Sequence, residues 1–199
     1  MPSDNHIQKL IFEFNKLPGI GTKTSEKFVY HLLKQRPEEL DKLIYAVNEL
    51  KKIKRCKNCF NFSFEQDLCS ICTDQKRNNN QICVVAEIQT IASIEKTKEY
   101  FGLYHILDGY LSPMEGITPD KLKIKELVAR IKNSSINEIL FAFNPNIDGE
   151  ATSIYLFNIL KPYKIKITRL GRGISMGADL DYSDEITLSD ALRGRKELK

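Results

Sequence analysis

Apolar positions in the first 50 residues recur with the spacing of amphipathic helices. A first helix carries an apolar face whose members lie three and four positions apart, namely Ile7, Leu10, Ile11 and Phe14. Leu-Pro-Gly-Ile-Gly at 17–21 interrupts this pattern, and a second helix is expected from Thr22 or Lys23. Pro37, followed by two glutamates, marks the start of a third helix. These patterns predict a helical region over residues 1–55.

After residue 81 the pattern changes to short apolar runs that alternate with helical stretches. Four runs are predicted strands, at 82–86, 104–107, 139–143 and 165–170. Helices are expected between them, at 88–99, 120–133 and 149–160. This alternation predicts a parallel sheet whose functional groups gather at the carboxyl ends of the strands. The polar run at 76–81 is predicted to be a linker before the sheet, and 188–193 a short closing helix.

Four cysteines in two close pairs are the strongest chemical signal in the chain. They are Cys56, Cys59, Cys69 and Cys72. Two such pairs can complete a tetrahedral Zn²⁺ shell with no open position, so we expect one structural zinc per chain. A redox pair or an iron–sulfur cluster is the alternative. Four thiolates on Zn²⁺ carry a formal charge of −2, which the neighbouring Lys54, Arg55 and Lys57 are expected to offset. Cys83, inside an apolar run, is expected to be a core residue.

The glycine-containing turn at 17–21 is a candidate site for phosphate. Gly19 and Gly21 allow a tight turn and a close approach of another chain, and the amides that open the next helix at Thr22 favour an anion. Lys23 and Lys27 lie four apart on that helix and would add positive charge beside a nucleic-acid backbone. The alternative is an ordinary corner in which the glycines only permit helix packing.

A third cluster follows the predicted strand at 139–143. It contains Asn144, Asn146, Asp148 and Glu150. Hard cations such as Mg²⁺ prefer several carboxylates, whereas two of these four side chains are amides. Glu150 is better interpreted as a first-turn acid that complements the dipole of its own helix. The cluster is therefore a weak candidate for a magnesium site.

Composition and charge narrow the class of protein. The chain is 42% hydrophobic and 28% charged, which is typical of a globular protein and excludes collagen-like and wholly disordered classes. Its net charge of +4 is too small to indicate a nucleic-acid binder by itself. The excess is local, because residues 1–55 hold 11 Lys and Arg against seven Asp and Glu. We expect a cytoplasmic protein without a membrane contact, since the start of the chain lacks a secretory signal and no long apolar run occurs.

The order of these motifs resembles the bacterial RecR family of recombination mediators. The resemblance spans essentially the whole chain and includes the stretches at 111–117 and 173–177 and a closing Leu-Arg-Gly-Arg. It implies a mixed α/β protein of several modules. These are a helix-hairpin-helix region at 1–55, a four-cysteine zinc finger at 56–73, a Toprim domain at 80–174 with a parallel-rich sheet flanked by helices, and a short C-terminal extension at 175–199.

The resemblance also implies a function. The resemblance implies a ring-like oligomer, so a dimer or a tetrameric ring is expected here. Members of the family act with the RecO and RecF proteins to load RecA on single-stranded DNA coated by single-strand-binding protein. The four cysteines match the family's zinc ligands, and Lys23 and Lys27 match its basic positions facing DNA. The expected DNA ligands are duplexes and junctions between single and double strands.

The Toprim region departs from the pattern of catalytic Toprim enzymes. Those enzymes have a glutamate at the end of the first strand and an Asp-x-Asp motif at the end of a later strand. Here Ala86 stands at the first place, with Glu87 beside it, and Asn144 and Asn146 stand at the others. Neighbouring strand residues face opposite sides, so Glu87 does not simply replace the missing acid. Metal-dependent cleavage of DNA is expected to be lost, and the protein is not expected to be an enzyme.

What remains at these strand ends is interpreted as a docking surface for partner proteins. Its candidate residues are Glu87, Asn144, Asp148 and Glu150. Two other functions stay open from the sequence. The first is a Mg²⁺-dependent nuclease or a primase-like enzyme that uses Glu87, Asp148 and Glu150. The second is a zinc-stabilised scaffold with no role at DNA.

Overall fold

The computed structural model describes residues 4–197, and the chain divides into two compact units at Ile53/Lys54. Eight α-helices are described: α1 Asp4–Asn15, α2 Thr22–Leu32, α3 Pro37–Glu49, α4 Ser70–Thr73, α5 Ile88–Thr97, α6 Ile124–Lys132, α7 Ile147–Leu160 and α8 Glu185–Arg193. Six strands are described: β1 Ile53–Arg55, β2 Phe62–Phe64, β3 Asn78–Val85, β4 Gly102–Ile106, β5 Glu138–Ala142 and β6 Lys166–Arg169. None of the described helices has the length and apolar character needed to cross a bilayer.

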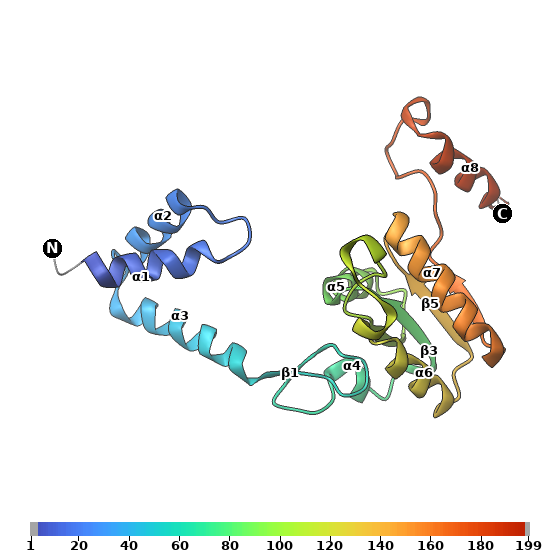
Figure 1. The fold of residues 1–199 in the computed structure, drawn as a ribbon, viewed down its shortest axis with the longest axis horizontal. Helices are drawn as coiled ribbons and strands as arrows, with labels where there is room; N and C mark the ends of the chain where they lie inside the picture. The colour runs from blue at the N-terminus through green and yellow to red at the C-terminus, as the bar shows by residue number, and fades with distance from the viewer. Residues whose placement is uncertain (1–3, 198–199) are drawn as a thin grey trace. The chain divides into compact units, whose positions relative to one another are not determined.

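The first unit holds helices α1, α2 and α3 (Figure 1). Ile11 of α1 and Val29 of α2 are buried, and the rings of Phe14 and Phe28 meet edge to face with centroids 5.8 Å apart. By contrast, α3 buries none of its residues. We define its apolar face by Leu43, Ile44 and Val47 together with Leu50, the residue directly after the helix, and these side chains are 43–61% exposed. Packing within the first unit therefore does not explain this apolar face.

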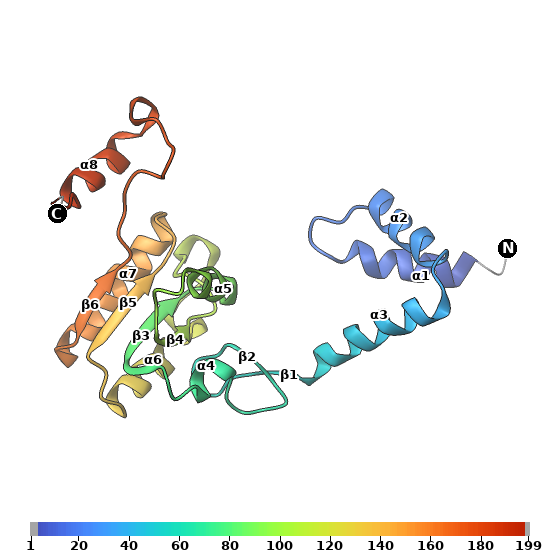
Figure 2. The same cartoon turned by 180° about the vertical axis from the view of Figure 1, so that it is seen from behind.

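The second unit is built on a parallel sheet of four strands in the order β4-β3-β5-β6 (Figure 2). Residues of β3 alternate between its two faces. Ile82 and Val84 belong to the core that includes Leu127 of α6 and Leu156 of α7. The opposite face belongs to a second core, formed by Cys83, Val85, Tyr104 and Ile106 together with Ile91 of α5. The predicted parallel sheet flanked by helices is confirmed, and Cys83 is a buried core residue as expected.

The four-cysteine segment at 56–73, called the cysteine module below, lies against the α5 face of this sheet. Phe60 and Ile71 pack on the second core, and the backbone amide of Ile106 donates to the carbonyl of Cys59 at 3.0 Å. The ring of Phe60 also meets His105 edge to face, with centroids 5.5 Å apart. His105 is fully buried, and this burial lowers its pKa to about 4. The module thus packs on the core of the sheet domain and does not form a separate domain.

Several predicted boundaries differ from the observed ones. The linker expected at 76–81 is wrong, because β3 begins at Asn78. Its polar side chains are exposed while its backbone pairs with Gly102 of β4 and with β5. The helix expected from residue 149 begins at Ile147, because the Asn146 side chain caps it. Likewise α8 begins at Glu185, three residues before the expected start, because Asp184 accepts hydrogen bonds from the amides of Ile186 and Thr187.

Candidate nucleic-acid interface and metal centre

The turn between α1 and α2 is fixed from inside by a buried serine. Ser25 is fully buried, and its hydroxyl donates to Asn15 Oδ1 at 2.7 Å. Gly19 has φ +77°, in the left-handed region that favours glycine. Gly21 has φ −92° and ψ 172°, an extended conformation that any residue adopts, and its carbonyl accepts from the amides of Thr24 and Ser25. The turn is therefore held in place by hydrogen bonds within the chain.

The outer side of this turn is open. The amides of Thr22 and Lys23 have no hydrogen-bond acceptor within residues 4–197. Lys23 and Lys27 are exposed, and no carboxylate of the described chain pairs with either of them. Free amides at a helix N-terminus beside two unpaired lysines form a surface complementary to phosphate. The structure thus brings together all the residues predicted for this site.

Gly21 separates the two interpretations of the turn. If the glycines served only helix packing, a methyl group at Gly21 would meet a neighbouring atom. A Cβ built at Gly21 meets nothing within 4 Å, and the same holds for Gly19. Backbone conformation explains glycine at 19, whereas neither conformation nor internal packing explains it at 21. Bare space in front of free amides suits the close approach of another molecule.

The four paired cysteines converge on one point. Their sulfur atoms all lie within 4.8 Å of one another, and Cys59 Sγ is 3.5 Å from Cys69 Sγ. Sulfurs in a tetrahedral site with bonds of about 2.3 Å lie about 3.8 Å apart, so this cluster fits a closed four-sulfur shell. Three of the cysteines are buried and Cys72 is partly buried. These four residues could therefore hold a metal ion.

The packing of these thiols opposes their simultaneous ionisation without a metal. The hydrogen bond with Cys69 raises the pKa of Cys59, and the bond from Cys59 lowers the pKa of Cys69. A divalent cation would displace the thiol protons and bind all four groups as thiolates.

Two of the cations expected to offset the thiolate charge have other partners. Arg55 pairs with Asp108 at 2.5 Å and donates to the carbonyl of Phe60. Lys57 pairs with Asp67 at 2.5 Å, and its side chain is 70% exposed. The prediction that these neighbours in the sequence neutralise the site is therefore wrong for Arg55 and Lys57. Sequence proximity does not determine which carboxylate a flexible cation reaches.

The ends of β3 and β5 meet at one edge of the sheet. Val85 pairs with Ala142, so the residues that follow each strand lie close together. Ala86 is buried, and its carbonyl accepts from the amide of Gly109. Glu87 lies outside the strand as the residue before α5 and is exposed. Glu87 therefore does not take the place of an acid at Ala86.

The loop after β5 is tightly organised around Gly149. Asn146 Oδ1 accepts from the amide of Gly149 at 2.8 Å, which caps α7. A Cβ at Gly149 would lie 2.0 Å from the carbonyl oxygen of Asn144, so only glycine fits here. Asn144 and Asn146 are exposed, and Asp148 is partly exposed in the first turn of α7.

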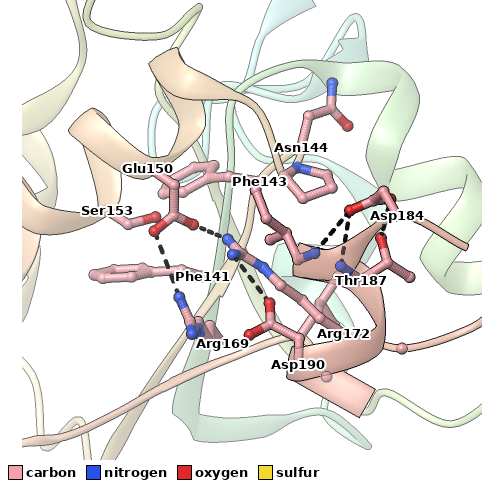
Figure 3. A pocket seen from close by; sticks show the side chains of 15 residues that line it. Phe141, Phe143, Asn144, Glu150, Ser153, Arg169, Arg172, Asp184, Thr187 and Asp190 are labelled. Atoms are coloured by element: carbon pink, nitrogen blue, oxygen red, sulfur yellow. Dashed lines mark hydrogen bonds and ion pairs between the residues drawn. The ribbon is translucent and has the colours of Figure 1, made fainter. Parts of the chain in front are cut away.

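Glu150 lies in a pocket between β5, β6 and the C-terminal extension (Figure 3). It pairs with Arg169 at 3.5 Å and also with Arg172. Arg172 in turn reaches Asp190 of α8 at 3.6 Å, so it bridges α7 to the extension. Glu150 is in the first turn of its helix, as predicted. Its charge is matched by two arginines that the sequence pattern does not indicate. The pairing of Arg172 with Glu150 could not be predicted from the sequence, because Arg172 lies in an irregular segment.

The acids of the proposed magnesium site do not gather. Within residues 4–197, the four cysteines are the one group of three or more Cys, His, Asp or Glu residues placed to share an ion. Glu87, Asp148 and Glu150 share the carboxyl edge of the sheet without forming such a group. The geometry there suits contacts with another surface better than coordination of a hard cation.

Comparison with known proteins gives matches along most of the chain. The family "RecR, helix-hairpin-helix" matches residues 7–51, "Toprim domain" matches 80–171 and "RecR, C-terminal" matches 173–196. A curated relative, "Recombination protein RecR" of Herpetosiphon aurantiacus, is 46% identical over 193 residues. The alignment covers 96% of this chain and 94% of that protein. These matches confirm the expected combination of a helix-hairpin-helix region and a Toprim domain in a mixed α/β chain.

Proposed function

The chain belongs to the RecR family of recombination proteins, and from this premise we propose that it is a non-catalytic, DNA-binding mediator of recombinational repair. It would bind duplex DNA and junctions of single and double strands. It would act with RecO and RecF proteins to promote loading of RecA on single-stranded DNA coated by single-strand-binding protein. The protein would thus work on chromosomal DNA.

The observation that carries the proposal is the open turn between α1 and α2. Gly19 shapes the turn, and Gly21 leaves open space beside it. Thr22 and Lys23 offer free amides, and Lys23 and Lys27 add two unpaired charges. Contacts of this kind hold the phosphate backbone and carry no sequence information. A mediator that acts wherever single strands are exposed needs binding of this kind.

Binding by one turn alone would be weak, so we propose a homo-oligomer, either a dimer or a tetrameric ring. The unpartnered apolar face of α3 supports this proposal, because exposed contiguous apolar surface favours association. Several turns on one DNA molecule convert later contacts into intramolecular ones, which raises avidity without a strong single site.

We propose that the cysteine cluster holds one structural zinc per chain. Cys56, Cys59, Cys69 and Cys72 supply the four thiolates, and no coordination position is left for substrate. The bound ion would stabilise a module that has few apolar residues of its own. Its role would be to keep Phe60 and Ile71 docked on the sheet.

The carboxyl edge of the sheet is proposed as a docking surface for partner proteins. Glu87, Asn144 and Asp148 are available there, whereas Glu150 is engaged with two arginines. A partner that binds through Glu150 would therefore have to compete with Arg169 and Arg172. A Mg²⁺-dependent nuclease would need the same acids as metal ligands, so incubation of labelled DNA with Mg²⁺ or Mn²⁺ separates the two functions.

The DNA-binding proposal is tested with Lys23→Ala combined with Lys27→Ala. Each lost phosphate contact lowers the slope of log affinity against log salt by about 0.9, so about 1.8 is expected for each turn engaged. Lys9→Ala with Lys34→Ala is the matched control, because it removes the same charge from exposed positions outside the turn. Fluorescence anisotropy on duplex and junction DNA over a salt series gives the slopes. Equal slopes for both double variants would refute the proposed interface.

A further inference from the structure

Arg130 of α6 occupies an unusual position for a charged side chain. Its Nη1 donates to the carbonyl of Tyr104 at 2.6 Å and to that of Asn58 at 3.4 Å. Its Nη2 is buried without a hydrogen-bond partner in the described chain. No carboxylate of residues 4–197 pairs with it, although arginine cannot lose its charge in a protein. A charged group with one nitrogen buried and unpaired destabilises the fold unless an anion lies nearby.

The cysteine cluster lies beside this guanidinium, with Asn58 between them. Burial lowers the pKa of the Arg130 guanidinium, and the sulfurs of Cys72, Cys59 and Cys56 act in the opposite direction. Asn58 connects the two sites directly. Its carbonyl accepts from Arg130, and its side-chain amide lies 3.7 Å from Cys72 Sγ as a donor. The guanidinium thus faces the module at the first cysteine pair.

We propose that Arg130 is the counter-charge of the tetrathiolate site and couples metal binding to the docking of the cysteine module on the sheet domain. This inference rests on the proposed metal at the four cysteines. A divalent ion on four thiolates leaves a charge of −2. Arg55 and Lys57, the cations next to the ligands in the sequence, are already matched by Asp108 and Asp67. Arg130 has no such carboxylate and comes from a helix on the other side of the module's interface.

The coupling between metal binding and docking follows from the contacts that hold the Arg130 guanidinium in place. Arg130 is held by Tyr104 of β4, and Ile106 of the same strand donates to Cys59. With metal, the guanidinium faces a full tetrathiolate. Arg130 is therefore a positioning residue that favours the docked module in the metal-bound state.

The test compares metal affinity in full-length variants of Arg130. Loss of a group that supports metal ligands typically costs 10- to 100-fold in affinity, and we expect this loss for Arg130→Gln. Arg130→Lys keeps the charge and is expected to stay within about 3-fold of the unchanged protein. Lys57→Gln is the matched control, because it removes a cation inside the first cysteine pair that Asp67 already neutralises. Zn²⁺ affinity is measured by competition with a chromophoric chelator, and Co²⁺ absorption reports the tetrahedral four-sulfur shell.

Each outcome decides a separate point. Equal losses in Arg130→Lys and Arg130→Gln would indicate hydrogen bonding alone and overturn the counter-charge. Unchanged affinity in Arg130→Gln would also overturn it. If Arg130→Gln does not fold, Arg130→Lys decides alone, since a loss above 10-fold in that variant contradicts a role for charge. If the protein without any substitution binds neither Zn²⁺ nor Co²⁺, the metal site itself is refuted, and this inference with it.

Discussion

Replacement of Gly21 by alanine separates a DNA-binding turn from a packing corner. The backbone at Gly21 is extended, and a Cβ there meets no atom within 4 Å. Gly21→Ala is therefore expected to leave the free energy of unfolding unchanged or to raise it by about 0.4–1 kcal/mol, because alanine restricts the unfolded chain. In the bound state, the new methyl group would stand in front of the free amides of Thr22 and Lys23.

The expected loss of DNA affinity can be worked out from these contacts. A hydrogen bond to a charged group contributes about 1.5–3 kcal/mol, so the loss of one amide–phosphate bond weakens binding roughly 10- to 150-fold. Gly173→Ala is the matched control, because Gly173 is equally open and lies in the other unit. Thermal unfolding and fluorescence anisotropy on one duplex measure both effects. A variant that loses stability while it binds DNA normally would refute the reasoning and restore the packing interpretation.

Three further predictions follow from buried and exposed groups. Ile44→Glu places a charge on the apolar face of α3 and should raise the dissociation constant of the oligomer at least about 10-fold, as measured by sedimentation, with the fold of the chain unchanged. His105 is buried with a pKa near 4, below the ordinary 6.5, so its contribution to stability is present above pH 6.5 and is lost as pH falls. The loss between pH 6.5 and 5 is about 1.5 kcal/mol, and a shallower pH slope of unfolding in His105→Leu would verify it. Gly149→Ala should destabilise the sheet domain by about 2–3 kcal/mol in chemical denaturation, because the methyl group overlaps the Asn144 carbonyl; a change below 0.5 kcal/mol would contradict this.

Local signals in the sequence predict the elements well and their exact ends less well. The spacing of Ile7, Leu10 and Ile11 is enough to predict α1, and alternating apolar runs predict the parallel sheet. The start of β3 at Asn78 could not be predicted, because pairing with neighbouring strands extends a strand whose side chains are polar. The capping of α7 by Asn146 was readable in principle, since asparagine is a preferred residue before a helix.

The candidate sites also differ in whether they depend on local sequence or on contacts between distant segments. Cysteine spacing predicts a cluster because all four ligands lie within one short segment. The glycine turn is equally local, so its residues are found together. The partners of Glu150 and the setting of Arg130 depend on contacts between distant segments, with Arg130 lying 72 residues from Asn58. Charge pairing between distant segments depends on the tertiary structure, and local residue types and spacing do not show which charges meet.

Native mass spectrometry of the full chain with DNA and Mg²⁺ tests the central claim most directly. The account predicts several chains, each carrying one zinc, on a DNA molecule that stays intact. A single chain bound to DNA that is cut during the incubation would contradict it.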